Sequence, residues 1–237
     1  MQVFFADVLS DGSLRLPPDE AQHCVRVLRK RPGDEIHCID GKGHYFAGKI
    51  SLIEKDRVEV QVLDRVDEWG EHTFGITLAV SPLHNKDRFE WIIEKAVELG
   101  ATAIQPLMCR HTDKYQARYK DARLMTILAS ALKQCKRSRM PVLHPAADAT
   151  PWLRESHSGL RLIASGDAAT HIYKETAHIA AAQEVTLLIG PEGDFSAEEL
   201  ALAQETGWTA ISLGNNRLRT ETAALMGLSY IKGVKGY

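Results

Sequence analysis

The sequence lacks the features that define several large classes of protein. Only four of its 237 residues are cysteines, and none of them forms a CxxC pair or has zinc-site spacing. The ten histidines form no HExxH motif or similar cluster. No apolar run approaches the roughly 18 residues that a membrane-spanning helix needs. We therefore expect no metal and no membrane partner.

The first twelve residues, MQVFFADVLSDG, have neither the basic flank nor the sustained apolar core of a secretory signal. Without such a signal, Cys24, Cys38, Cys109 and Cys135 are expected to be free thiols in the reducing cytoplasm. Hydrophobic residues make up 44% and charged residues 25%, which is typical of globular proteins and argues against disorder. The length allows one large domain or two modest ones.

The two parts of the sequence differ in hydrophobic pattern. Up to about residue 70, short alternating segments are separated by turn residues, which predicts a small β-barrel. From residue 73 onward, strand-like segments alternate with helical ones, beginning with a strand over 74–80 and a helix over 86–99. Repeated strand–helix units predict an α/β domain with a mostly parallel sheet. We therefore predict two domains, residues 1–70 and 71–237.

Two strand–turn–helix units near the carboxyl terminus, within residues 184–225, are the most informative part of the sequence. The apolar run VTLLI ends at GPEG, and the run AISL ends at Gly214. Glycines let the backbone turn sharply and approach a ligand closely. In open α/β sheets, ligands bind outside the carboxyl ends of the strands. The two turns are therefore the predicted active site.

The helices that follow the turns carry start signals. Ser196 and Glu199 have the spacing of a capping box, with Phe195 and Leu200 placed to form a hydrophobic staple. After the second turn, Thr220 is the predicted N-cap. Each unit alone could be an ordinary strand–helix corner, because single glycine motifs are weak signals.

The pair of motifs LIGPEGDFSAEEL and SLGNNRLRTETAAL resembles the RsmE family, which methylates N3 of a uridine in 16S (small-subunit) ribosomal RNA. The resemblance extends upstream to HCVRVLR and EWIIEKAVELG, and so covers nearly the whole chain. It implies a SPOUT methyltransferase domain with a deep trefoil knot, preceded by a PUA-like RNA-binding barrel. It also implies a homodimer that uses S-adenosyl-L-methionine.

The two turns and the end of the strand-like segment at Ala164 are the expected cofactor site. The resemblance implies this, because SPOUT enzymes hold the cofactor at such turns. The candidate cofactor-binding residues are Ala164, Ile189, Gly190, Pro191, Glu192, Gly193, Leu213, Gly214, Leu218 and Arg219. Loss of the N3 proton leaves negative charge on the uracil, and fixed cations are suited to stabilise that charge. The catalytic candidates are Arg219 first, then Arg137 and Arg110, and the sequence shows no obvious general base.

Positive charge is concentrated in one window although the whole chain has a net charge of −2. Residues 110–139 contain nine Lys or Arg residues and only two acids, Asp113 and Asp121, which gives a local charge of +7. Tyr115 and Tyr119 stand between the basic residues. A smaller basic group lies near residue 30. Such concentration predicts a phosphate-binding surface. The candidate RNA-binding residues are Arg26, Arg29, Lys30, Arg31, Lys133, Lys136, Arg137 and Arg139.

Two alternative functions remain open at this point. The protein could be a non-catalytic RNA-binding assembly factor on the same scaffold, or a SPOUT methyltransferase acting on a ribose 2′-hydroxyl. A third signal, the P-loop spacing over residues 43–49, is discounted because Ile50 replaces the hydroxyl residue and a strand-like segment follows. Whether the substrate is naked RNA or RNA in the small ribosomal subunit is also open.

Overall fold

The computed structural model describes residues 1–55, 57–113, 119–155 and 157–237. The chain forms two compact units, which are described separately. The first unit consists of residues 1–72 and 129–140, and the second of residues 73–128 and 141–237. The basic residues Lys114 and Arg118, together with Tyr115, lie outside the described residues.

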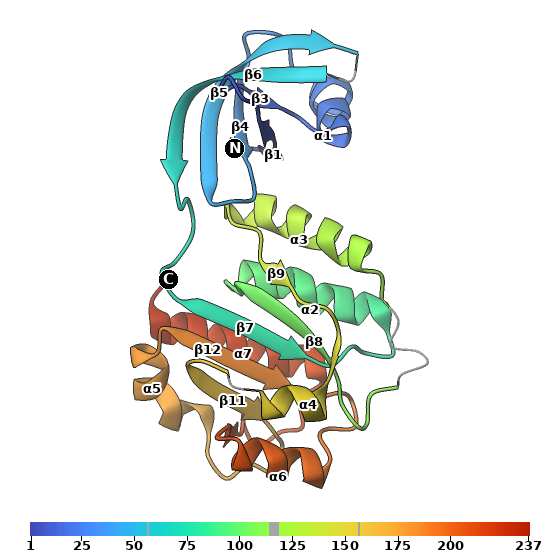
Figure 1. The fold of residues 1–237 in the computed structure, drawn as a ribbon, viewed down its shortest axis with the longest axis vertical. Coiled ribbons are helices and arrows are strands. Elements are labelled where there is room, and N and C mark those ends of the chain that lie inside the picture. Colours follow the sequence, from blue (N-terminus) through green and yellow to red (C-terminus); the bar gives the residue numbers. More distant parts are fainter. Residues whose placement is uncertain (56, 114–118, 156) are drawn as a thin grey trace. The chain divides into compact units, whose positions relative to one another are not determined.

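The first unit is built on a six-stranded sheet in the order β1-β4-β5-β6-β3-β2 (Figure 1). All neighbouring strands are antiparallel except β1 and β4. The strands are β1 (Val3–Phe5), β2 (Asp7–Val8), β3 (Leu14–Arg15), β4 (Glu35–Ile39), β5 (His44–Glu54) and β6 (Arg57–Asp67). Residues 44–49 thus belong to a strand, as expected from the rejection of the P-loop.

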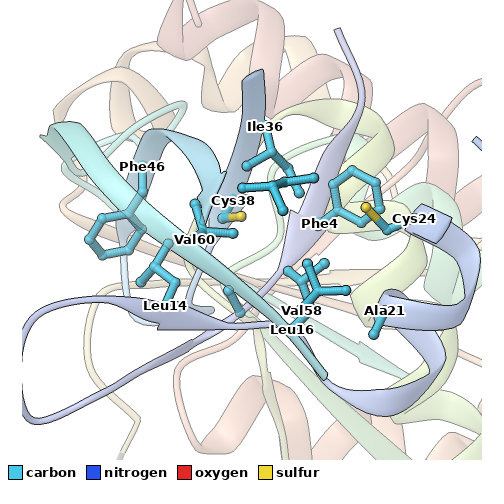
Figure 2. Close-up of a cluster of buried hydrophobic side chains, with 12 residues drawn as sticks. Phe4, Leu14, Leu16, Ala21, Cys24, Ile36, Cys38, Phe46, Val58 and Val60 are labelled. Atoms are coloured by element: carbon cyan, nitrogen blue, oxygen red, sulfur yellow. The ribbon is translucent and has the colours of Figure 1, made fainter. Parts of the chain in front are cut away.

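The sheet of the first unit curls around an apolar core. Alternate residues of β4 and β5 and the short helix α1 (Pro18–Gln22) contribute to this core, with Phe4, Leu14 and Ile36 almost fully buried (Figure 2). A π-helical turn, η1 (His23–Val27), follows α1. Gly48 lies at a bulge of β5, where a β-carbon would stand 2.5 Å from the carbonyl oxygen of Gln61. That close backbone approach explains the glycine within the strand.

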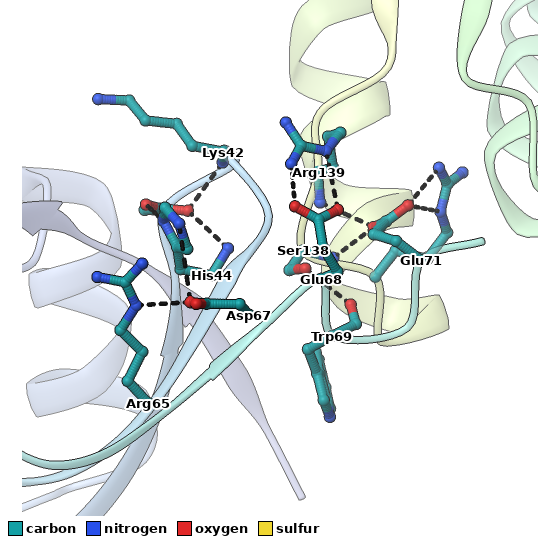
Figure 3. A network of polar contacts seen from close by, with 11 residues as sticks. Lys42, His44, Arg65, Asp67, Glu68, Trp69, Glu71, Ser138 and Arg139 are labelled. Carbon is teal, nitrogen blue, oxygen red and sulfur yellow. Dashed lines mark hydrogen bonds and ion pairs between the residues drawn. The ribbon is translucent and has the colours of Figure 1, made fainter. Parts of the chain in front are cut away.

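A buried ion pair fixes residues 136–140 within the first unit. Both Arg137 and Glu71 have side chains less than a tenth exposed. Glu71 Oε2 accepts hydrogen bonds from Nε and a terminal nitrogen of Arg137, at 3.1 and 2.9 Å. Glu71 Oε1 accepts the backbone N–H groups of Ser138 and Arg139, each at 2.8 Å (Figure 3). Four donors therefore satisfy one buried carboxylate.

The four thiols differ in environment, and this gives a labelling prediction. Burial raises the pKa of Cys38 and of Cys109 to about 12 and also raises the pKa of Cys24. A buried, protonated thiol is a poor nucleophile. Cys135 is only half-buried. At about pH 8, iodoacetamide should therefore modify Cys135 well before the other three.

Peptide mass mapping after timed quenching measures this order, with the denatured protein as the control in which all four thiols react. Modification of Cys38 or Cys109 in the native protein at a rate similar to that of Cys135 would contradict the buried placement.

The second unit contains a fully parallel sheet in the order β10-β8-β7-β12-β11-β13, with β9 also paired to β8. The strands are β7 (Gly75–Val80), β8 (Ala103–Met108), β9 (Val142–Leu143), β10 (Ala147–Asp148), β11 (Leu160–Ala164), β12 (Glu184–Ile189) and β13 (Thr209–Ile211). The predicted α/β class with a parallel sheet after a small β unit is confirmed, although the first sheet is a half-barrel. The knot stays a prediction.

Helices cover both faces of the parallel sheet, so its central strands are buried on each side. The helices of this unit are α2 (Lys86–Glu98), α4 (Ala149–Arg154), α5 (Thr176–Ala181), α6 (Ala197–Glu205) and α7 (Thr220–Lys235), with a 3₁₀ turn η2 (Ile172–Glu175). The helix α3 (Asp121–Cys135) begins in this unit, and its residues from 129 onward belong to the first. Leu188 packs in a cluster with residues of α4 and α6. Leu187, one residue earlier, contacts Gly227 of α7 on the other face. This alternation follows from the pleat of the strand.

Candidate cofactor and RNA site

The carboxyl ends of three neighbouring strands enclose a cavity of about 720 Å³ in the second unit. Ala164 of β11 pairs with Ile189 of β12 on one side and with Ile211 of β13 on the other, so the three strands end at the same level. The turns after them form the cavity wall, and the amino-terminal turns of α2 and α7 complete it. The geometry places the turns of both sequence motifs against one another.

Nine of the ten candidate cofactor residues line this cavity. They are Ala164, Ile189, Gly190, Pro191, Glu192, Leu213, Gly214, Leu218 and Arg219. Gly193 is not among the lining residues. It lies against His111, whose β-carbon would be 3.0 Å from a β-carbon added to the glycine.

The turn between β12 and α6 is held from two sides. The N–H of Asp194 donates to the carbonyl of Pro191 at 3.0 Å, closing the turn. His111 Nδ1 donates to the carbonyl oxygens of Gly193 and Asp194, at 3.1 and 3.0 Å. The carboxylate of Glu192 accepts the backbone N–H of His84 at 3.3 Å. These contacts fix the turn before any ligand binds.

The start of α6 confirms the capping box expected from the sequence. The hydroxyl of Ser196 accepts the backbone N–H of Glu199 at 3.2 Å, and the carboxylate of Glu199 accepts that of Ser196 at 2.9 Å. The second carboxylate oxygen accepts the N–H of Arg110 at 2.8 Å. Phe195 and Leu200 belong to the same apolar cluster, as the predicted staple requires.

The turn after β13 leads directly into α7. Gly214 has a φ of 131°, a conformation that side-chain-bearing residues rarely adopt, and a β-carbon there would meet no atom within 4 Å. The N-cap of α7 is Arg219 rather than the predicted Thr220, because Arg219 has extended backbone angles and Thr220 is already helical. The Arg219 side chain makes no capping bond, is exposed and lines the cavity.

The sequence reasoning missed an arginine of the cavity that lies outside both motifs. Arg88, in the first turn of α2, lines the cavity, and its Nε donates to Oε1 of Glu221 in the first turn of α7 at 2.9 Å. These residues are 133 positions apart in the chain. No local pattern reveals such a pair. Arg217 and Asp194 were also missed, although both stand inside the two motifs and could have been included by proximity.

The other two catalytic candidates do not line the cavity. Arg137 is buried in its ion pair with Glu71, so its guanidinium is already occupied by a carboxylate. That placement supports a structural role. Arg110 is exposed, and its backbone N–H supports the capping carboxylate of Glu199.

The basic window is partly neutralised by acids that are distant in sequence. Lys133 pairs with Glu20, Arg139 with Glu68, and Arg123 with Glu90. Counting charge along the chain therefore overestimates the positive potential of this segment. Lys30 donates to the carbonyl of Glu35. The remaining RNA-binding candidates are exposed, and none forms an ion pair with another described residue: Arg26, Arg29, Arg31 and Lys136.

Neither a metal site nor a membrane-spanning helix is found among the described residues. Within residues 1–55, 57–113, 119–155 and 157–237, no three His, Cys, Asp or Glu side chains are grouped so that they could hold a metal ion. No helix in those ranges combines the length and apolar character needed to cross a membrane.

Comparisons with known proteins agree over nearly the whole chain. Residues 70–232 match the family described as RNA methyltransferase domain, and residues 16–63 match RNA methyltransferase PUA domain. Ribosomal RNA small subunit methyltransferase E of Bacillus subtilis is 29% identical, over 90% of this chain and 87% of its own. The enzyme of that name from Mycobacterium bovis is 30% identical, over 97% and 90%.

A crystal structure of ribosomal RNA small subunit methyltransferase E from Neisseria gonorrhoeae, bound to S-adenosyl methionine, has the same fold. It is 31% identical with a TM-score of 0.87, and the alignment covers 98% of this chain and 97% of that one. The chain therefore belongs to the ribosomal RNA small subunit methyltransferase E family of RNA methyltransferases.

Proposed function

We propose that this protein transfers the methyl group of S-adenosylmethionine to N3 of a uridine in 16S ribosomal RNA. The observation that carries the proposal is the cavity at the ends of β11, β12 and β13, which is lined by the turns of both family motifs. Its volume lies within the range of about 300–1,000 Å³ that is usual for small-molecule sites. The full-length likeness to an enzyme crystallised with this cofactor supports the same ligand.

The residues of the cavity fit the chemistry that this transfer needs. S-adenosylmethionine supplies an electrophilic methyl group on a sulfonium. Gly214 leaves room for backbone groups to approach and orient a ligand, whereas a side chain at Gly190 would meet the ring of Phe195. Removing the N3 proton leaves negative charge on the uracil, and a positioned cation stabilises it. We assign this role to Arg219, which lines the cavity and whose side chain is not used in capping.

Two measurements test the function. Calorimetric titration of the protein with S-adenosylmethionine should show binding, and no binding at millimolar ligand would leave the assembly-factor alternative. Mass-spectrometric mapping of modified nucleosides in 16S ribosomal RNA, from cells with and without the gene, should show loss of one 3-methyluridine. Loss of a ribose-methylated nucleoside instead would favour the 2′-O-methyltransferase alternative.

We assign RNA binding to the first domain, residues 1–70, and methyl transfer to the second, residues 71–237. The exposed cations Arg26, Arg29 and Arg31 of the first domain support this division. The enzyme would act in the cytoplasm, where ribosomes are assembled, on RNA in the small ribosomal subunit.

Replacing Arg26, Arg29 and Arg31 together by glutamine should weaken RNA binding. The slope of log K against log[salt] should also become shallower by about 2, if each cation neutralises one phosphate of single-stranded RNA. Fluorescence anisotropy with a short RNA at several salt concentrations measures this slope. The matched control is Arg15→Gln with Arg57→Gln, because both arginines already pair with Glu59. An unchanged slope in the triple variant would remove this group from the interface.

We also propose that the protein is a homodimer that uses the exposed face of α2 and α7. These helices pack together, and each exposes a large apolar side chain: Trp91 is 41% exposed and Met226 is 40% exposed. Sedimentation velocity should give a dimer for the wild type and a monomer for Met226→Glu. A wild-type monomer at micromolar concentration would contradict this assignment.

A further inference from the structure

The turn between β12 and α6 contains a residue in a conformation that favours glycine. Asp194 has a φ of 60°, in the left-handed region. Aspartate tolerates this region better than most residues, but glycine adopts it at no steric cost. Strain of this kind occurs often where a side chain is used by a binding site. Asp194 lines the cavity, and a glycine in its place would supply no carboxylate.

The carboxylate of Asp194 is held in place but not fully used. Its Oδ1 accepts the N–H of Phe195 at 2.8 Å. Its Oδ2 lies 3.5 Å from the N–H of Gly166, on the turn after β11, and has no other partner in the part of the chain that the structure describes. The backbone on which it stands is fixed by Pro191 and His111. The result is a rigid anion between two walls of the cavity.

The other carboxylates of the cavity are less suited to meet a ligand. Glu221 is paired with Arg88. Glu192 is exposed, and one of its oxygens accepts the N–H of His84. Asp167 is exposed, so water screens its charge. Asp194 is half-buried, and a fixed, partly desolvated charge acts more strongly on a bound ligand.

We propose that Asp194 is a specificity-determining residue whose carboxylate recognises the positively charged part of the cofactor. This inference rests on the proposed function, because S-adenosylmethionine carries two cationic groups, its sulfonium and its ammonium. A carboxylate contact with either group is a charge-assisted interaction. It selects the methyl donor over uncharged adenosine derivatives that fill the same space.

The test compares two ligands in one calorimetric experiment. S-adenosylmethionine carries the cationic groups, whereas 5′-methylthioadenosine keeps the adenosine and a neutral thioether. Asp194→Asn, which keeps the shape but removes the charge, should bind S-adenosylmethionine about tenfold more weakly or worse. Its affinity for 5′-methylthioadenosine should be unchanged. Asp64→Asn, at an exposed aspartate that does not line the cavity, is the matched control and should bind both ligands as the wild type does.

A second variant separates recognition from local structure. Asp194→Gly relieves the left-handed backbone, so its melting temperature without ligand should not fall, while its affinity for S-adenosylmethionine should fall as in Asp194→Asn. Unchanged affinity in Asp194→Asn would overturn the inference, as would an equal loss for both ligands. A wild-type protein that binds neither ligand would overturn the proposed function instead, so the two failures are distinguishable.

Discussion

Arg219→Ala is expected to lower the rate of methyl transfer about a hundredfold to a thousandfold, the range seen when one donor to a developing anion is removed. The reason is the position of Arg219. It is the N-cap of α7 and lines the cavity, and its side chain makes no capping bond. Single-turnover kinetics with saturating cofactor and ribosomal RNA measures this step. The affinity for S-adenosylmethionine should change much less than the rate.

Two further variants define what the Arg219 result means. Arg217 also lines the cavity, but a terminal nitrogen of its guanidinium donates to the carbonyl of Glu192 at 3.4 Å. Arg217→Ala should therefore have the smaller effect on rate. Arg219→Lys should recover part of the activity, because it keeps the charge and loses the planar donor group. Equal losses in Arg217→Ala and Arg219→Ala would mean that general positive potential matters rather than one positioned cation.

Glu71→Ala is expected to destabilise the first unit by about 3–5 kcal/mol, the usual cost of leaving one partner of a buried ion pair uncompensated. The change would remove the carboxylate that pairs with the buried guanidinium of Arg137 and accepts the backbone N–H groups of Ser138 and Arg139. Arg137→Met should cost less than Glu71→Ala, because the remaining carboxylate keeps its two backbone donors. Urea unfolding followed by circular dichroism gives the free energies.

The exposed ion pair of Arg139 and Glu68 is the matched control for the buried ion pair of Arg137 and Glu71. Arg139 and Glu68 have side chains that are 49% and 57% exposed. Arg139→Ala should cost at most about 1 kcal/mol, as is typical of surface ion pairs. Combining Glu71→Leu with Arg137→Met should recover part of the loss, since no unpaired charge would remain. A cost for Glu71→Ala as small as that of Arg139→Ala would contradict the buried placement.

Local sequence patterns predicted the elements that depend on neighbouring residues. The capping box of Ser196 and Glu199 is an interaction across three positions, so its spacing alone identifies the start of α6. The apolar run at β12 predicted a strand buried on both faces, and every residue of β12 after Glu184 is buried. The glycine turns identified the strand ends that form the cavity. The Thr220 N-cap was wrong by one residue, because an extended residue without a capping side chain leaves no signal.

Long-range electrostatics could not be read from the sequence in the same way. Arg137 looked like a candidate for RNA or catalysis because it stands in a basic window, yet its partner Glu71 is 66 residues away. The same is true of Arg88 and Glu221 in the cavity wall. Whether an arginine meets solvent, a ligand or a buried carboxylate depends on which chain segments the fold brings together.

The sequence by itself determined the class of fold, the two turns and the family, because these rest on period, spacing and short motifs. Only the tertiary structure decided which charges are available and which residues share the cavity. The physical reason is that hydrophobic periodicity and capping act over a few residues of chain. Ion pairing and cavity formation act through space, between segments whose order in the sequence carries no record of their contact.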